Sequence, residues 1–263
     1  MLKGGSLDLG LDHRTALICA STSGLGLATA HALADEGATV VINGRSADRA
    51  EEVAAGLPGA VAVGCDLAGE NGAEQLFEAA TDKVGDIDIL VLNGPGPPPG
   101  RAVDIEAGGA DSALATLLMP QLELVRLALR GMSAKRWGRI LSISSTSVVE
   151  PIPNLALSNL GRAALSGYLK TLAGEVAPLG ITVNSLLPGR VSTPRTRQID
   201  KAVAEAFGVS VAEAEQEVFR QIPMGRYGQP EEFGAVAAFL CSTQASYITG
   251  TAIRCDGGMV STI

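Results

Sequence analysis

Basic residues and histidines are few in this sequence, and their scarcity narrows the possible functions. The 263 residues include 28 acidic side chains against 20 basic ones, so the formal net charge is −8, and only two histidines are present. Binding to nucleic-acid phosphates needs a basic surface, so the charge argues against a nucleic-acid partner and indicates a solvated acidic surface. His13, near the N-terminus, and His31, inside a helical pattern, are expected to be structural.

Paired cysteines are also missing. The four cysteines are far apart, none forms a CxxC pair, and each lies in or beside an apolar run: Cys19, Cys65, Cys241 and Cys255. This pattern favours buried thiols over a disulfide or a zinc site, and we expect no bound metal.

The sequence shows neither a signal peptide nor a membrane span. The N-terminal stretch MLKGGSLDLG lacks the basic start and the apolar centre of a signal peptide. No uninterrupted apolar run is long enough to cross a bilayer. We therefore expect a soluble protein in a reducing, cytoplasmic setting, with no membrane partner.

Strand and helix patterns alternate along the whole chain. Hydrophobic residues make up 46% and charged ones 18%, which suits a parallel sheet covered on both faces. Seven short apolar runs, each followed by a longer helical or irregular segment, cover residues 14–20, 38–44, 61–67, 87–93, 138–144, 181–188 and 252–258. The order predicts an α/β fold with one doubly wound, seven-stranded parallel sheet in a single domain.

Two long segments interrupt the alternation. They are residues 94–109, which contain the motif GPGPPPG, and the segment after Gly189. Long loops at the carboxyl ends of strands in such sheets are where ligands bind. We expect GPPPG (96–100) to form a stiff wall of the cleft, with Arg101 either contacting an anion or lying on the surface.

The turn ASTSGLG (20–26) joins the first strand to the first helix. At this position a pyrophosphate can meet the free N–H groups of a helix N-terminus, although a tight turn alone would also explain the glycines. The second strand ends Asn43-Gly44-Arg45-Ser46, without the acid that binds an NAD ribose. Arg45 can instead pair with a 2′-phosphate, which favours NADP(H) over NAD(H), unless it is simply solvated. Asp66 could accept from an adenine amino group or serve only as a turn residue.

These landmarks, taken in order, resemble the short-chain dehydrogenase/reductase family and most of all its 3-oxoacyl-[acyl-carrier-protein] reductase-like branch. The motifs are ASTSGLG, CDL (65–67), ILVLNG (89–94), GRILSISS (138–145), ITVNSLLPG (181–189) and the run from Pro223 to Gly258. The resemblance implies a Rossmann fold, a nicotinamide cofactor, hydride transfer at a carbonyl carbon and usually a homotetramer. The cofactor-binding residues expected on this basis are Ala20, Ser21, Ser23, Gly24, Leu25, Gly26, Gly44, Arg45, Ser46, Asp66, Leu67, Asn93, Gly94, Arg162, Pro188, Gly189, Val191 and Thr193.

The family's catalytic residues are largely replaced. The family uses an Asn, a Ser and a YxxxK pair. Ser145, with Ser144 beside it, matches the Ser, whereas Ser158 and Arg162 stand at the Tyr and Lys positions. The Asn position falls near Leu117. The first glycine of the phosphate turn is replaced too, by Ala20. Tyr168 and Lys170 cannot take over, because residues two apart on a helix point in different directions.

These replacements change the chemistry more than the binding. A serine hydroxyl is a far weaker acid than a phenol, and an arginine can hold ribose hydroxyls but cannot release a proton. Losing a general acid typically costs a factor of about 10²–10⁴ in rate, or roughly 3–5 kcal/mol. Because hydride transfer itself belongs to the cofactor, we expect a lowered or redirected activity rather than an inert protein. The catalytic candidates are Ser144, Ser145, Ser158 and Arg162.

Arg162 is expected to face inward. Six residues recur at helical spacing and form one stripe: Ser158, Arg162, Leu165, Leu169, Leu172 and Val176. If the apolar members face the sheet, Arg162 needs a partner, because burying a bare charge is costly. A cofactor ribose, a substrate carboxylate or enolate, or an internal acid such as Glu150 would serve.

The remaining expectations concern specificity and assembly. Residues 190–229, with a helical pattern over 207–221, resemble the family's substrate lid. The apolar helices at 111–135 and 154–179 would form a homotetramer or homodimer interface.

Three functions follow from this pattern. The first is an NADP(H)-dependent oxidoreductase acting on a carbonyl or alcohol of a small acyl or polyketide-like metabolite. The second is a non-redox lyase, dehydratase or isomerase on the same fold. The third is a catalytically silent, cofactor-binding subunit.

Overall fold

A single sheet of parallel strands organises the part of the chain that the computed structural model describes, residues 7–262. The first six residues of the N-terminal stretch and Ile263 lie outside this range. Within it the strand order is β3-β2-β1-β4-β5-β6-β7 and every pairing is parallel. The strands are β1 (Thr15–Ile18), β2 (Thr39–Gly44), β3 (Val61–Gly64), β4 (Ile89–Leu92), β5 (Gly138–Ile143), β6 (Ile181–Pro188) and β7 (Ala252–Cys255).

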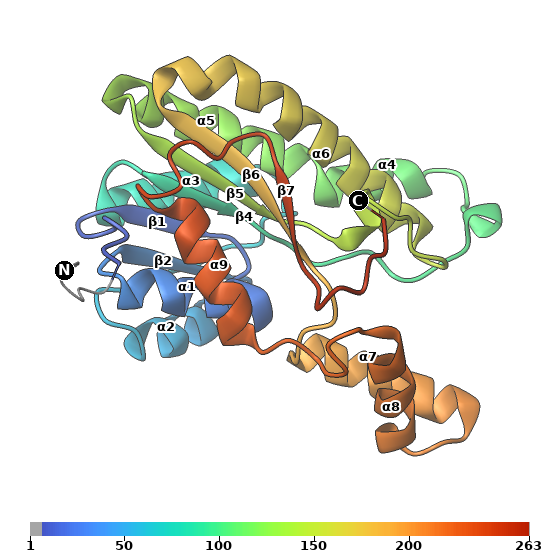
Figure 1. Cartoon of the computed structure of the whole chain (residues 1–263). Helices are drawn as coiled ribbons and strands as arrows, with labels where there is room; N and C mark the ends of the chain where they lie inside the picture. Colours follow the sequence, from blue (N-terminus) through green and yellow to red (C-terminus); the bar gives the residue numbers. More distant parts are fainter. Residues whose placement is uncertain (1–6, 263) are drawn as a thin grey trace.

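Helices cover both faces of this sheet, so the predicted doubly wound fold is confirmed (Figure 1). One layer contains α1, α2 and α9, and the other contains α3, α5 and α6 with α4 at its end. The helices are α1 (Gly24–Asp35), α2 (Ala47–Ala55), α3 (Gly72–Val84), α4 (Gly109–Leu117), α5 (Met119–Lys135), α6 (Ala156–Val176), α7 (Pro194–Phe207), α8 (Val211–Gln221) and α9 (Pro230–Cys241).

The central strands are buried on both sides, which explains why apolar residues predominate in them. All residues of β4 and β5 are buried, and so are the first seven of β6. A half-buried strand would alternate apolar and polar residues, whereas these strands need apolar side chains on both faces.

All four cysteines are free thiols, and burial raises the pKa of Cys19 and of Cys241 to about 12.

The strand order reverses between β1 and β4, and this reversal locates the cleft. The connection from β1 runs to one side of the sheet and the connection from β4 to the other, so a crevice opens at their carboxyl ends. The turn 20–26, the loop 93–108, Ser144 and Pro188 all follow the ends of neighbouring strands.

Several predicted elements end earlier than expected, and two of them have a clear local cause. The single helix predicted over 111–135 is broken at Leu118 into α4 and α5. Pro120 explains the break, because it lacks an N–H and disfavours helical backbone at the residue before it. The strand predicted over 252–258 stops at Cys255, where the Asp256 carboxylate accepts from the N–H groups of Gly258 (3.0 Å) and Val260 (3.0 Å) and forms a turn.

The segment predicted as the lid is a helical hairpin that projects from the body of the protein (Figure 1). The predicted helix 207–221 begins only at Val211, and a further helix, α7, precedes it. Gly208 adopts a left-handed φ of 67° that ends α7, and Ser210 caps α8 through the backbone N–H of Glu213 (3.2 Å). The strongest contacts of α7 and α8 are with each other. Their role as a substrate lid stays a prediction.

The broken helix pair α4–α5 is unusually apolar. By length and composition Gly109–Lys135 could cross a membrane, and only 33% of its most apolar window is buried. The pair nevertheless packs on α3 and α6 in the same domain. A partly covered apolar surface of this kind also fits contact with another subunit.

A salt bridge at the base of the hairpin gives a test of acid stability. The Glu232 carboxylate accepts from Arg226 (2.7 and 2.8 Å) and from the backbone N–H of Gln229 (2.7 Å), and these donors hold its pKa at about 2 instead of 4.5. Because the folded-state pKa is depressed, the stabilisation is complete above about 4.5 and is lost as the pH falls towards 2. Glu232→Gln should therefore lower the melting temperature at pH 7 and have little effect at pH 2. Thermal unfolding followed by the fluorescence of the only tryptophan, Trp137, measures both; an equal difference at the two pH values would contradict this assignment.

Candidate active site

The turn between β1 and α1 is tied to the end of β2. The N–H of Ala20 donates to Asn43 Oδ1 (3.0 Å), and the N–H of Ser21 donates to the Asn43 carbonyl (2.8 Å). Ala20 has a left-handed φ of 47°, where the family has glycine. Asn43 is a site-forming residue that sequence reasoning missed. A polar residue at the end of a buried strand was its only signal.

The N-terminus of α1 is open to an anion. Ser23 is the N-cap residue, yet no side chain caps the helix, and its first turn contains no acid. The first N–H groups of a helix lack partners inside the helix, so they can donate to a phosphate. Leu25 packs against the core below this turn.

Gly26 lets the turn fold tightly onto Asn93. A Cβ atom at Gly26 would lie 2.7 Å from the Ala20 carbonyl oxygen and 2.9 Å from Asn93 Nδ2. The Asn93 amide itself donates to the carbonyls of Cys19 and Ala20, both at 3.2 Å. The Asn93 side chain, predicted to contact the cofactor, is therefore used to hold the turn.

Gly24 and Thr193 lie together, although 169 positions separate them in the sequence. A Cβ atom at Gly24 would contact the Thr193 side chain at 3.9 Å. Thr193 is the N-cap of α7, and its hydroxyl accepts from the N–H of Thr196 (3.2 Å). The structure thus brings the predicted phosphate turn and Thr193, predicted to bind the cofactor, to one place.

The predicted adenosine-binding residues lie at the ends of β2 and β3. Arg45 is exposed, and its guanidinium makes no hydrogen bond or ion pair with any residue from 7 to 262. Ser46 accepts from the N–H of Arg49 (3.3 Å) as the cap of α2, and Asp66 accepts from the N–H of Ala68 (3.1 Å). Leu67 packs against the core.

Close packing explains two of the predicted glycines. A Cβ atom at Gly44 would clash with the Thr22 side chain at 2.6 Å, and one at Gly189 would clash with the Asp256 backbone at 2.6 Å. A Cβ atom at Gly94 would make only an ordinary contact, 3.7 Å from Gln121 Nε2. Pro188 ends β6, and Val191 is buried and paired with Gly228 by a parallel bridge.

Arg162 is the centre of the candidate catalytic group. Its Nε donates to the Ser158 hydroxyl (3.2 Å), and its Nη1 donates to the carbonyls of Ser144 (3.0 Å) and Ile143 (3.4 Å). The predicted stripe on α6 is confirmed, because the other five members are buried against the sheet and Arg162 is partly buried. Ser145 follows Ser144 directly after β5, and its hydroxyl accepts from the N–H of Ser147 (3.1 Å).

No acid neutralises Arg162 among the described residues. None of the ion pairs between residues 7 and 262 includes it, so Glu150 is not its partner. Burial lowers the pKa of the Arg162 guanidinium, with no carboxylate to oppose the effect. The group remains a cation, because arginine does not lose its proton in proteins.

Apolar groups occupy the place of the family's asparagine. Leu117 is buried at the end of α4, and a Cβ atom at Gly161 would lie 2.7 Å from its Cδ1. One turn later Gln121 is buried on α5, where its Nε2 donates to the Asn93 carbonyl (3.5 Å) and its Oε1 has no hydrogen-bond partner among the described residues. Sequence reasoning missed Gln121.

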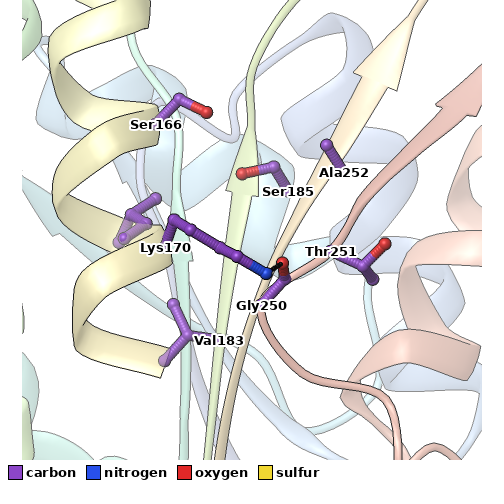
Figure 2. A pocket seen from close by; sticks show the side chains of 8 residues that line it. Ser166, Lys170, Val183, Ser185, Gly250, Thr251 and Ala252 are labelled. Carbon is purple, nitrogen blue, oxygen red and sulfur yellow. Dashed lines mark hydrogen bonds between the residues drawn. The ribbon is translucent and has the colours of Figure 1, made fainter. Parts of the chain in front are cut away.

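Tyr168 and Lys170 do not reach this group. Lys170 lies two turns beyond Arg162 on α6, about 12 Å farther along the helix axis. Figure 2 shows its side chain crossing to the loop before β7, where Nζ donates to the Gly250 carbonyl (2.6 Å). The small cavity beside it, about 130 Å³, is lined by residues of α6, β6 and β7. Burial and the nearby Glu175 raise the pKa of Tyr168.

The whole arrangement fits a dinucleotide that carries an extra phosphate. The uncapped helix, the close approach at Gly26 and Thr193 beside Gly24 suit a pyrophosphate, and Arg45 is free for a further anionic group. Arg162 and Ser158 can donate hydrogen bonds to an oxygen in the cleft, but neither is an acid suited to neutral pH.

Known proteins share this sequence and architecture over nearly the whole chain. Residues 19–260 match the family described as Enoyl-(Acyl carrier protein) reductase. The chain is 35% identical over 260 residues to 3-oxoacyl-[acyl-carrier-protein] reductase FabG of Aquifex aeolicus, covering 96% of this chain and all of that protein. It is 30% identical over 259 residues to NADPH-dependent reductase BacG of Bacillus subtilis, with the same coverage. The solved structure of L-sorbose reductase from Gluconobacter frateurii with NADPH and L-sorbose superposes with a TM-score of 0.93 at 32% identity, covering 98% of this chain and 100% of that one.

Proposed function

From the premise that this chain belongs to the short-chain dehydrogenase/reductase family, we propose that it is an NADP(H)-dependent oxidoreductase with a non-standard active site. Its substrate is a carbonyl compound or alcohol among small acyl or polyketide-like metabolites. The observation that carries the proposal is the open N-terminus of α1, with Gly26 packed on Asn93 and Thr193 beside Gly24.

The names of similar proteins support the cofactor and the substrate class. One relative is an NADPH-dependent reductase, another a 3-oxoacyl-[acyl-carrier-protein] reductase, and a third a putative ketoacyl reductase of the monensin polyketide synthase from Streptomyces virginiae. A D-beta-hydroxybutyrate dehydrogenase and a steroid dehydrogenase solved with NADH are also similar to this chain. The names of the relatives therefore do not decide between the two cofactors, and the preference for NADP(H) rests on Arg45.

The chain's own residues divide into a binding and a polarising group. Bound NADPH would supply the hydride, while the turn 20–26, Arg45 and Thr193 hold its phosphates. Ser145, Ser158 and Arg162 orient and polarise the substrate oxygen. The proton comes from water or from an acidic group of the substrate, because the serines and the arginine are poor proton donors at neutral pH.

Stopped-flow measurement of NADPH absorbance tests this function. The purified protein is mixed with NADPH and a panel of ketones, 3-oxoacyl thioesters and unsaturated carbonyl compounds. We expect stoichiometric NADPH oxidation with at least one compound class. Tight NADPH binding without oxidation by any of them would contradict the redox assignment.

Replacing Arg45 should change cofactor selectivity. Hydrogen bonds to charged groups contribute about 1.5–3 kcal/mol each, so Arg45→Ala should weaken NADPH binding by roughly 10- to 150-fold. NADH has no 2′-phosphate, so its affinity should stay the same. Isothermal titration calorimetry of both cofactors measures the ratio. Arg49→Ala, one turn into α2, is the matched control, because Arg49 already pairs with Glu52 (2.6 Å). Equal losses for NADPH and NADH in Arg45→Ala would contradict this role.

A second function is favoured by one observation, that the Arg162 cation has no acid partner among residues 7–262. Such a cation can stabilise an enolate in a lyase, dehydratase or isomerase step. Product formation by cofactor-free protein would support this alternative. Strict dependence on NADPH, consumed in proportion to product, would exclude it.

We also propose that copies of the chain assemble through α4–α5 and α6, as a homotetramer or a homodimer in the cytoplasm. The apolar α4–α5 segment is only partly covered, and α6 exposes the small residues Ala163, Ala164 and Gly167. Small side chains allow two helices to approach closely. Size-exclusion chromatography with light scattering measures the assembly, and a monomer at high concentration would contradict it.

A further inference from the structure

Only one nitrogen of the Arg162 guanidinium, Nη2, is open to a ligand. Nε is bound to Ser158, and Nη1 is bound to the carbonyls of Ile143 and Ser144. Nη2 makes no hydrogen bond with any residue from 7 to 262, and it is not sealed off from solvent. It lies near Gly96, since a Cβ atom built on Gly96 would be 3.9 Å from Nη2. The free donor is therefore accessible to a ligand beside the loop that follows β4.

Ser158 adds a second donor beside the first. Its hydroxyl oxygen accepts from Arg162 Nε, so its own hydrogen can point only to another group. Nε and Nη2 form one edge of the planar guanidinium, which places the Ser158 hydroxyl next to any oxygen that Nη2 binds. An oxygen atom bound at Nη2 can therefore accept from both donors.

The occupied donors exclude a paired carboxylate. A carboxylate bound by arginine in the usual way needs two parallel N–H groups from the same edge of the guanidinium. Nε is already taken by Ser158 and Nη1 by the carbonyls of Ile143 and Ser144, so neither edge that contains Nη2 offers such a pair. A single negatively charged oxygen fits the free Nη2 group and the hydroxyl.

The absence of a general acid selects the kind of oxyanion. Hydride addition to a simple ketone produces an alkoxide, a strong base that needs a proton donor in the site. An enolate is a much weaker base, because its charge is shared with carbon, and a fixed cation is sufficient to hold it. We propose that Arg162 Nη2 and the Ser158 hydroxyl form an enolate-binding site, so the substrate is a carbonyl compound that becomes an enolate during the reaction.

If the reaction is a reduction by NADPH, this inference rests on the proposed function. In that reaction, a hydride from NADPH forms a C–H bond at the carbon of a conjugated C=C that is farther from the carbonyl. The C=C π electrons form a new C=C next to the oxygen, which gains the negative charge, and NADPH becomes NADP⁺. A proton from water then adds to the carbon beside the carbonyl and gives the saturated product. Arg162 and Ser158 act by holding the oxygen and donate no proton.

The test measures the acidity of a bound enolate probe. The probe is 1,3-cyclohexanedione, whose enolate has its own ultraviolet absorption, and one Trp and three Tyr give the protein a low background. An opposite charge close to an ionisable group typically shifts its pKa by about 1–3 pH units. We expect the pKa of the probe to be lowered by that amount when it is bound to the wild-type protein. Arg162→Gln should abolish the shift, and Ser158→Ala should reduce it.

Matched variants separate charge from folding. Arg162→Lys keeps the charge and should retain part of the shift, whereas Arg49→Gln removes a surface arginine and should behave as wild type. An unchanged probe pKa in the wild type, the same shift in Arg162→Gln, or no probe binding would each overturn the inference. Calorimetry with NADPH on the same preparation distinguishes the two proposals. A probe shift without NADPH binding contradicts only the proposed function, and NADPH binding without a probe shift contradicts only the enolate site.

Discussion

Replacing Gly26 with valine should weaken the binding of NADPH by roughly 100-fold or more. The Cβ atom of the new side chain would lie 2.7 Å from the Ala20 carbonyl oxygen and 2.9 Å from Asn93 Nδ2, so the turn must open. Opening the turn displaces the amides that donate to the pyrophosphate. At about 1.5–3 kcal/mol for each charge-assisted hydrogen bond, losing two of them weakens binding by roughly 100-fold or more.

A matched substitution distinguishes this local effect from a general loss of stability. Gly56→Val introduces the same side chain at the end of α2, where the nearest atom is 3.5 Å from the new Cβ position. NADPH affinity should be unchanged in that variant. Overpacking at Gly26 costs about 1–3 kcal/mol, so the melting temperature of Gly26→Val must be measured beside its calorimetric titration. A folded Gly26→Val protein that binds NADPH with wild-type affinity would contradict the location of the phosphate site.

Restoring the family's proton donor should accelerate the reduction of simple ketones. In the double variant Ser158→Tyr with Arg162→Lys, a phenol stands beside a lysine one turn away on α6. General acid catalysis contributes a factor of about 10²–10⁴, and we expect a gain of this order in kcat for a saturated ketone. The steady-state rate of NADPH oxidation, compared with wild type, measures it.

The single variants provide the control for this gain. Ser158→Tyr alone keeps a cation nearby but lacks the lysine, and Arg162→Lys alone lacks the phenol, so each should fall short of the double variant. Effects of residues that act as a unit are not additive, which the comparison would reveal. No gain in the folded double variant would mean that proton supply is not what limits the wild-type protein with ketones.

The sheet and the inward face of α6 were predictable from the sequence, because both depend on patterns within short segments. The unbroken apolar run Ile89–Leu92, like the largely apolar run Gly138–Ile143, indicates a strand that is buried on both faces. The spacing of Leu165, Leu169 and Leu172 indicates one buried helix face. The same spacing correctly predicted that Arg162 lies on this face.

The helix break at Leu118 and the helix α7 were not predicted. The run over 111–135 is apolar on both sides of Pro120, so composition alone hides the break that the proline causes. The pattern of α7 is weak, because only Thr196, Asp200 and Ala204 are buried and most of the helix is exposed.

Contacts between distant segments account for the rest of what the sequence left open. Asn43 and Asn93 hold the phosphate turn by donating to or accepting from backbone groups that belong to other strands. The lack of an acid beside Arg162 depends on which loops surround the N-terminal half of α6. Neither fact is contained in a local pattern of residues, so each required the three-dimensional structure.

Calorimetric titration of the wild-type protein with NADPH and then with NADH tests the central claim most directly. The account predicts saturable binding of NADPH, with weaker binding of NADH because Arg45 has no 2′-phosphate to contact. If neither cofactor binds to the folded protein, the cleft at the ends of β1 and β4 is not a nicotinamide site, and the assignment as an oxidoreductase is wrong.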